Sequence, residues 1–212
     1  MTRAAVTGFP ANLVVDGRRC VVVGAGRIAA RKISALLTAG ARVHVVAPDV
    51  SDEVRAWADA GALTVAARAF EASDLDDAWL ATTATGVPAV DHSVHEAAEA
   101  RRVWVNSADD PANCSFTLMS VVRRGDLVVT IGTGGRSPAL AAWLRRRLGE
   151  ELGPEYEVLL DLLAEAREAV RAEGRSTEEP DWQAALDSGM LDLVRAGRVD
   201  EAKELLAACL SS

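Results

Sequence analysis

The stretch that decides the fold reads Cys20-Val21-Val22-Val23-Gly24-Ala25-Gly26-Arg27-Ile28-Ala29. An apolar run leads directly into a glycine-rich turn, and the segment 27–39 then carries apolar side chains at helical spacing. Gly24 permits the tight turn, Gly26 has no Cβ to keep a phosphate away, and Ala29 lets the helix pack on the strand. Such a turn presents backbone N–H groups and a helix N-terminus to a pyrophosphate. We therefore expect dinucleotide binding here, with Ala25, Arg27 and Ile28 completing the site, and we expect valine at position 24 or 26 to abolish binding by a clash.

The length and hydrophobic content of the chain suit a globular protein. The 212 residues, half of them hydrophobic, are enough for one full domain and a smaller one. Cys20, Cys114 and Cys209 show neither paired nor metal-ligand spacing, which favours a reducing cytoplasm. The first ten residues hold one arginine and no long apolar run, so we expect neither a signal peptide nor a membrane span.

The charge is acidic and unevenly distributed. The net charge of −8 argues against a general nucleic-acid binder. Residues 150–212 hold 16 acids and 6 bases, whereas residues 1–149 hold 15 acids and 17 bases. We interpret the acidic part as a solvated helical surface, and the first part has arginines to place around an anionic ligand.

Strand and helix patterns alternate over the first half of the chain. Strands are predicted at 42–46, 63–67, 79–84 and 103–106, with a helix capped by Ser51 and another over 88–101. This alternation predicts a parallel sheet with right-handed crossovers, so residues 1–113 are expected to form a Rossmann-like α/β domain.

The pattern changes after residue 113. Two strand patterns, 115–121 and 127–131, are joined by the short link 123–126, which indicates an antiparallel pair. A glycine-rich segment, 132–138, precedes a helix predicted at 139–152, and the remainder reads as helices and short turns.

Ligands of doubly wound sheets bind beyond the carboxyl ends of the strands. Pro48 and Asp49 follow the second strand, and an acid there would bond the ribose hydroxyls and repel a 2′-phosphate, which favours NAD over NADP. The alternative is that Asp49 only starts a turn. Thr82 and Thr85, after the fourth strand, either line the cofactor or are simple strand-end threonines.

Two later segments carry further candidates. Asp109 and Asp110 follow the fifth strand, where a carboxylate would take a proton when hydride leaves a neighbouring atom, although acids before Pro111 also suit a turn. Gly134 and Gly135 precede a helix and suit an anion-binding nest, to which Arg136 adds positive charge.

The histidines do not suggest a metal site. His92 and His95 share one face of the predicted helix without an evident third ligand, so a solvated face is the expected interpretation. His44 lies within a strand and is expected to be structural.

Together these stretches resemble the precorrin-2 dehydrogenase/sirohydrochlorin ferrochelatase family, which includes the N-terminal half of multifunctional sirohaem synthase. The matches run in order from about residue 9 to 150. They comprise residues 22–32, 40–43, 45–48, 79–81 with Thr85, 105–109, 112–116 and 134–138.

The resemblance implies an activity. Family members oxidise precorrin-2, a polycarboxylate tetrapyrrole, to sirohydrochlorin with NAD, and some also insert Fe²⁺. The catalytic aspartate of the family's Asn-x-x-Asp element falls on Asp109. The substrate-binding residues are then expected to be Asn106, Thr133, Gly134, Gly135, Arg136 and Ser137, with Arg123 or Arg124 as a further anchor for the acid side chains.

The resemblance also implies a three-part homodimer. The parts are the NAD-binding domain 1–113, a dimerisation region 114–150 and a helical C-terminal domain 151–212. No nucleic-acid or membrane partner is expected. Two competing hypotheses remain, a regulatory module that senses NAD(H) without catalysis and a metal chelatase that uses no NAD.

Overall fold

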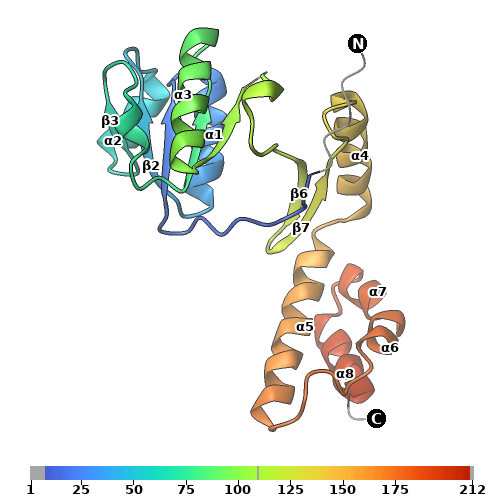
Figure 1. Ribbon diagram of the computed structural model, residues 1–212. Coiled ribbons are helices and arrows are strands. Elements are labelled where there is room, and N and C mark those ends of the chain that lie inside the picture. The colour runs from blue at the N-terminus through green and yellow to red at the C-terminus, as the bar shows by residue number, and fades with distance from the viewer. Residues whose placement is uncertain (1–7, 109, 211–212) are drawn as a thin grey trace. The chain divides into compact units, whose positions relative to one another are not determined.

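A computed structural model describes residues 8–108 and 110–210 (Figure 1). The chain folds into two compact units, with the division between Leu118 and Met119. The first unit runs from Gly8 to Leu118 and holds a five-stranded sheet, and the second holds a two-stranded sheet and the remaining helices. Each unit is described by itself below.

The sheet of the first unit is parallel and has the order β3-β2-β1-β4-β5. Its strands are β1 (Arg19–Val23), β2 (Arg42–Val46), β3 (Thr64–Ala66), β4 (Leu80–Thr83) and β5 (Trp104–Ser107). This arrangement confirms the predicted Rossmann-like α/β class. Because β1 pairs with β2 on one side and with β4 on the other, the chain reverses its direction of winding at β1, which is where such folds bind ligands.

Helices cover both faces of this sheet. The helices are α1 (Arg27–Thr38), α2 (Asp52–Asp59) and α3 (Pro88–Arg101), with 3-10 turns at Ala72–Leu75 and Pro111–Asn113. Ile33 of α1 and Val54 of α2 share one buried cluster with Val22 and Val45, whereas Val94 of α3 joins the strand residues of the other face. The near-continuous apolar strands are the expected consequence of burial on both faces.

The strand predicted at 115–121 begins five residues later than expected. β6 (Ser120–Arg124) pairs antiparallel with β7 (Leu127–Ile131). The preceding residues are bonded to the parallel sheet instead, because the Ser115 N–H donates to the Val105 carbonyl at 2.8 Å. The predicted antiparallel pairing with β7 is therefore confirmed, but residues 115–119 lie outside the strand.

The rest of the second unit is helical, as predicted. It contains α4 (Pro138–Glu151), α5 (Glu155–Ala172), α6 (Trp182–Asp187), α7 (Met190–Arg195) and α8 (Val199–Leu210). The last four helices share a core around Leu162, Met190 and Leu206. Among the described residues, no helix is both long and apolar enough to cross a membrane.

Candidate cofactor and substrate site

Gly24 is required by the fold itself. Its φ of +106° is one that side-chain-bearing residues rarely adopt. A Cβ on Gly24 would lie 2.6 Å from the Ala84 carbonyl oxygen, because the loop after β4 crosses directly over the turn. The Gly24 N–H donates to the Val46 carbonyl at 2.8 Å, so the turn is also tied to β2.

Gly26 differs from Gly24 in that open space lies before it. It is exposed, its φ is −83°, and within the described part of the chain no atom lies within 4 Å of a Cβ built on it. It is the N-cap of α1, whose first turn has no side-chain cap and no acidic residue. The N–H groups of a helix start need acceptors, so this turn fits a pyrophosphate.

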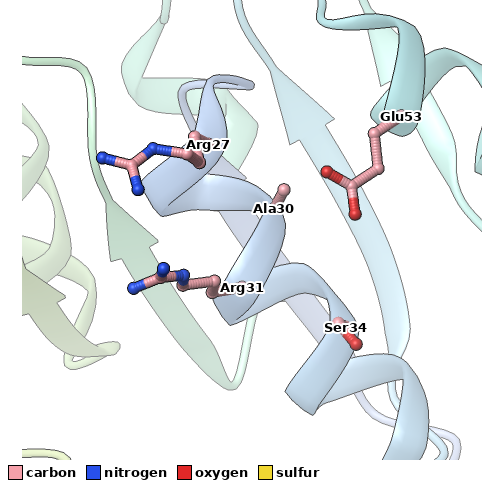
Figure 2. A pocket seen from close by; sticks show the side chains of 5 residues that line it. All are labelled: Arg27, Ala30, Arg31, Ser34 and Glu53. Carbon is pink, nitrogen blue, oxygen red and sulfur yellow. The ribbon is translucent and has the colours of Figure 1, made fainter.

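The start of α1 is also positively charged. Arg27 is its first residue, and Ile28 beside it is 46% exposed. Figure 2 shows Arg27 and Arg31 projecting from the same side of α1, while Glu53 comes from α2. These side chains, with Ala30 and Ser34, line a hollow of about 350 Å³ beside the glycine turn.

The loop after β2 lies next to the glycine turn. The Ser51 N–H donates to the carbonyl of the buried Ala25 at 3.3 Å. Pro48 and Asp49 are both exposed in this loop. Ser51 occupies the N-cap position of α2 as predicted, but its hydroxyl makes no capping bond, and the oxygen is buried without a hydrogen-bond partner in the described residues.

The two threonines after β4 have different environments. Thr82 is 2% exposed, and its hydroxyl has no hydrogen-bond partner within the described ranges. The Thr85 hydroxyl donates to Asp91 at 2.7 Å and accepts from the Val87 N–H at 3.0 Å. The cofactor contacts expected for both therefore remain a prediction.

Sequence reasoning missed Asp91, which organises this loop. Its carboxylate is 6% exposed and accepts hydrogen bonds from the hydroxyls of Thr83 and Thr85. A polar residue in the first turn of a predicted helix is the one available signal. The structure shows that it holds the backbone that passes over Gly24.

Asn106 lies at the end of β5 and is 8% exposed. Its Nδ2 donates to the Phe116 carbonyl at 3.0 Å, and its Oδ1 accepts from Lys32 Nζ at 2.5 Å. Lys32 is the second residue that sequence reasoning missed at this edge of the sheet, because in the sequence it stands out only as part of the family's pattern.

The two aspartates after β5 are the candidates for proton transfer. Asp109 lies outside the described residues. The Asp110 carboxylate accepts from the Ala112 N–H at 3.2 Å and from Asn113 Nδ2 at 2.7 Å. Asp110 thus caps the 3-10 turn that begins at Pro111, which is the turn role expected for an acid in that position.

The glycine-rich loop 132–138 belongs to the second unit. Gly134 and Gly135 have φ values of +59° and +74°. The Thr133 hydroxyl accepts from the Ser137 N–H at 3.2 Å, and the Ser137 hydroxyl accepts from the Leu140 N–H as the N-cap of α4. Arg136 is exposed at this turn. The anion-binding nest expected at this loop remains a prediction.

The histidines are structural or exposed. His44 Nδ1 lies 2.8 Å from the Thr64 hydroxyl, and burial, followed by the nearby Arg19 charge, lowers the pKa of His44. His92 is exposed, whereas His95 is half-buried, so the expected solvated face holds for His92 only. The described residues contain no cluster of histidine, cysteine and acidic side chains that would hold a metal ion.

Comparison with known proteins agrees with this geometry. The sequence model of a family described as putative NAD(P)-binding matches residues 11–120. A siroheme synthase from Nitrosococcus oceani is 34% identical over 204 residues, which cover 95% of this chain and 44% of that protein. Siroheme synthase 2 from Cronobacter sakazakii is 45% identical over 139 residues, which cover 66% of this chain and 30% of that protein. This chain thus spans less than half the length of these relatives.

A solved structure matches over its whole length. The precorrin-2 dehydrogenase SirC superposes with a TM-score of 0.76 at 26% identity, covering 95% of this chain and 100% of SirC. The glycine turn, the loop after β2 and the end of β5 all fall within the matched NAD(P)-binding segment. The chain therefore belongs to this NAD(P)-binding family, and within it to the precorrin-2 dehydrogenase group that its sequence resembles.

Proposed function

We propose that this protein oxidises precorrin-2 to sirohydrochlorin with NAD. The observation that carries the proposal is the open turn at Gly26, at the point where the sheet reverses its winding, in a chain that matches a precorrin-2 dehydrogenase over nearly its whole length. The first turn of α1 has no side-chain cap and no acidic residue, so its N–H groups can bind an anion.

In this proposal the first unit binds the cofactor. The N–H groups of the first turn of α1 bind the pyrophosphate, with Arg27 adding positive charge. Asp49 bonds the ribose hydroxyls. NAD, when bound, supplies the acceptor for the hydride.

Two further segments act on the substrate. Asp109 accepts the proton that accompanies hydride loss. We assign this role to Asp109 because it is the aspartate of the Asn-x-x-Asp element. The Asp110 carboxylate instead accepts hydrogen bonds within the turn at Pro111. Arg136 and the loop 133–137 bind carboxylates of the tetrapyrrole through charge-assisted hydrogen bonds.

Iron insertion is the second candidate activity. It is favoured by the 34% identity to a siroheme synthase over nearly the whole of this chain. Fe²⁺ is then a substrate, delivered to sirohydrochlorin in the same site.

We also infer a homodimer that uses the hairpin and α4. Val121 and Val128 are exposed on the β6–β7 pair, and Leu140 and Trp143 are 48% and 46% exposed on α4, which has no buried residue. An apolar surface of this kind, beside a two-stranded sheet with open edges, is typical of an interface. Light scattering at micromolar concentration is expected to give twice the mass of the chain, and a monomer would contradict the inference.

A cytoplasmic location is inferred from the thiols. No disulfide bond joins cysteines within the described residues, and burial raises the pKa of the Cys20 thiol to about 11. Cysteines persist as thiols in reducing compartments. A fluorescent fusion that distributed to the periplasm or the membrane would contradict this location.

The decisive experiment measures turnover of precorrin-2 with NAD in the absence of metal. Asp109→Asn is expected to lower kcat by about 10²-fold or more, the usual scale for loss of a general base. Asp110→Asn is the matched control and is expected to change kcat much less. If neither variant loses activity, Asp109 is not the base, and if only Asp110→Asn is inactive, the assignment is off by one residue.

The same assay separates the competing hypotheses. An NAD(H)-sensing module would bind NAD without turning over precorrin-2. A chelatase that uses no NAD would convert sirohydrochlorin and Fe²⁺ but leave precorrin-2 unchanged. Either result with the wild-type protein would overturn the proposed dehydrogenase.

A further inference from the structure

A small polar group interrupts the apolar layer between α1 and the sheet. Ala29 and Ile33 of α1 are fully buried against Val22 in this layer. Toward β5, however, Thr82 and Asn106 occupy paired positions of adjacent strands, and both are more than 90% buried. Lys32 reaches this group from α1, and its Nζ lies 2.5 Å from Asn106 Oδ1.

The Asn106 side chain is held at both ends. Its Oδ1 accepts from the Lys32 ammonium, and its Nδ2 donates to the Phe116 carbonyl at 3.0 Å. Because an amide with one bonded acceptor and one bonded donor has a single favourable orientation, the Asn106 side chain is fixed in direction. The next residue is fixed as well, since the Ser107 N–H donates to Cys114 Sγ at 3.2 Å.

The choice of lysine at position 32 is informative in this chain. Of the 23 basic residues, only Lys32 and Lys203 are lysines. Lys203 is an exposed side chain that pairs with Glu165. A compact ammonium suits a bond to one amide oxygen in a half-buried place, whereas the guanidinium fork suits carboxylates.

We propose that Lys32 is a positioning residue for the dehydrogenation. Its bond to Asn106 ties α1, whose first turn is the cofactor-binding turn, to the strand that leads three residues later to Asp109. The ammonium thereby sets the direction in which the chain leaves β5 relative to the bound cofactor. This inference rests on the proposed dehydrogenase function.

The test compares Lys32→Met, Lys32→Arg and the control Lys203→Met in the full chain. Lys32→Met keeps most of the length of the side chain and removes its charge and donors. We expect kcat for precorrin-2 to fall about 10-fold to 100-fold, the cost of a small misplacement of reacting groups. We expect the dissociation constant for NAD and the KM for precorrin-2 to stay within about threefold, since neither ligand loses a contact of its own.

The two other variants separate positioning from general stability. Lys32→Arg keeps a charged donor on a larger, planar group and is expected to recover only part of kcat, and Lys203→Met is expected to behave as wild type. A merely structural lysine would lower the melting temperature and the amount of active enzyme, and it would leave the kcat of the folded fraction unchanged. That result, or a Lys32→Met kcat within about twofold of wild type, would overturn the proposal.

Asn106 provides an independent check. In an Asn106→Leu background, adding Lys32→Met is expected to lower kcat no further, because the two residues act as one unit. With only two lysines, the side-chain NMR spectrum is simple, and Asn106→Leu is expected to shift the Lys32 signal but not that of Lys203. An unshifted Lys32 signal or additive losses would overturn the inference. If the wild-type protein turned over no precorrin-2, both the proposed function and this inference would be wrong. Normal turnover by Lys32→Met would overturn this inference alone.

Discussion

The two glycines of the cofactor turn are expected to fail in different ways when each is replaced by alanine. The expectation that both clash with the pyrophosphate is incomplete for Gly24, because its Cβ would already lie 2.6 Å from the Ala84 carbonyl oxygen and 2.9 Å from the Ala84 carbonyl carbon. Backbone atoms cannot move aside as a flexible side chain can. The φ of +106° adds strain for any residue with a side chain.

The magnitude for Gly24→Ala follows from these two effects. A sparsely populated backbone conformation costs about 1–3 kcal/mol, and overpacking costs about 1–3 kcal/mol more. The sum of roughly 2–6 kcal/mol is a large share of the stability of a domain, about 5–15 kcal/mol. At about 4 °C per kcal/mol, the melting temperature of the first unit is expected to fall by roughly 8–24 °C.

Gly26→Ala is the matched control and is expected to show the reverse. Its φ of −83° suits alanine, and the described residues leave the space in front of it open. Losing a glycine N-cap and stiffening the unfolded chain nearly cancel, so stability is expected to stay within about 1 kcal/mol. The added methyl group stands where the pyrophosphate must approach, and the dissociation constant for NAD is expected to rise at least about tenfold, which is about 1.4 kcal/mol.

The assay is thermal unfolding by circular dichroism without ligand, followed by calorimetric titration with NAD at a temperature where every variant is folded. Unchanged NAD affinity in Gly26→Ala would refute the placement of the pyrophosphate at this turn. A wild-type melting temperature in Gly24→Ala would refute the close crossing of the loop after β4.

Three further predictions concern the cofactor and the stability of the first unit. NAD is expected to bind more tightly than NADP, because Asp49 would repel a 2′-phosphate, and equal affinities in a titration would contradict this. The hydrogen bonds from Arg68 hold the pKa of Asp74 in the folded protein below its usual value. The ionised Asp74 therefore stabilises the fold above about pH 4, which is the pKa of an aspartate in the unfolded chain. This stabilisation is lost as the pH falls through the lower pKa of the folded protein. Asp74→Asn is therefore expected to melt below wild type at neutral pH, with a difference that shrinks in acid. Arg102 ends α3 with a φ of +57°, so Arg102→Gly is expected to raise the free energy of unfolding by about 0.5–1 kcal/mol, measured by urea denaturation.

Local sequence signals were sufficient for the elements themselves. The helix predicted at 88–101 was confirmed as α3 with the same bounds, because Pro88 suits a first helical position and the apolar stripe through Val94 has helical period. The apolar run before Gly24 became β1, and the alternation of strands and helices was enough to predict a parallel sheet. These signals depend on residues within about one helical turn of one another.

The candidate site was predicted only in outline. The sequence placed Gly24, Asp49 and Asn106 after or at the ends of their strands, and the strand order then brought the loops together. It did not reveal that Asp91 holds Thr83 and Thr85, since a polar residue in a helical first turn has many uses. For a related reason, the strand expected to start at Ser115 pairs with β7 as predicted but starts only at Ser120. β propensity favours extended backbone without specifying which neighbour completes its hydrogen bonds.

By itself, the sequence determined the fold class, the position of the glycine turn and the family, because each depends on short segments with their own periodicity and spacing. Only the tertiary structure decided that Gly24 leaves room for the loop at Ala84, while Gly26 faces open space. It also decided that Lys32 bonds to Asn106, which lies 74 residues away in the sequence. Such pairs are set by the packing of α1 on a sheet in which β1, β4 and β5 are neighbours, and contacts between residues so far apart leave no periodic trace in the sequence.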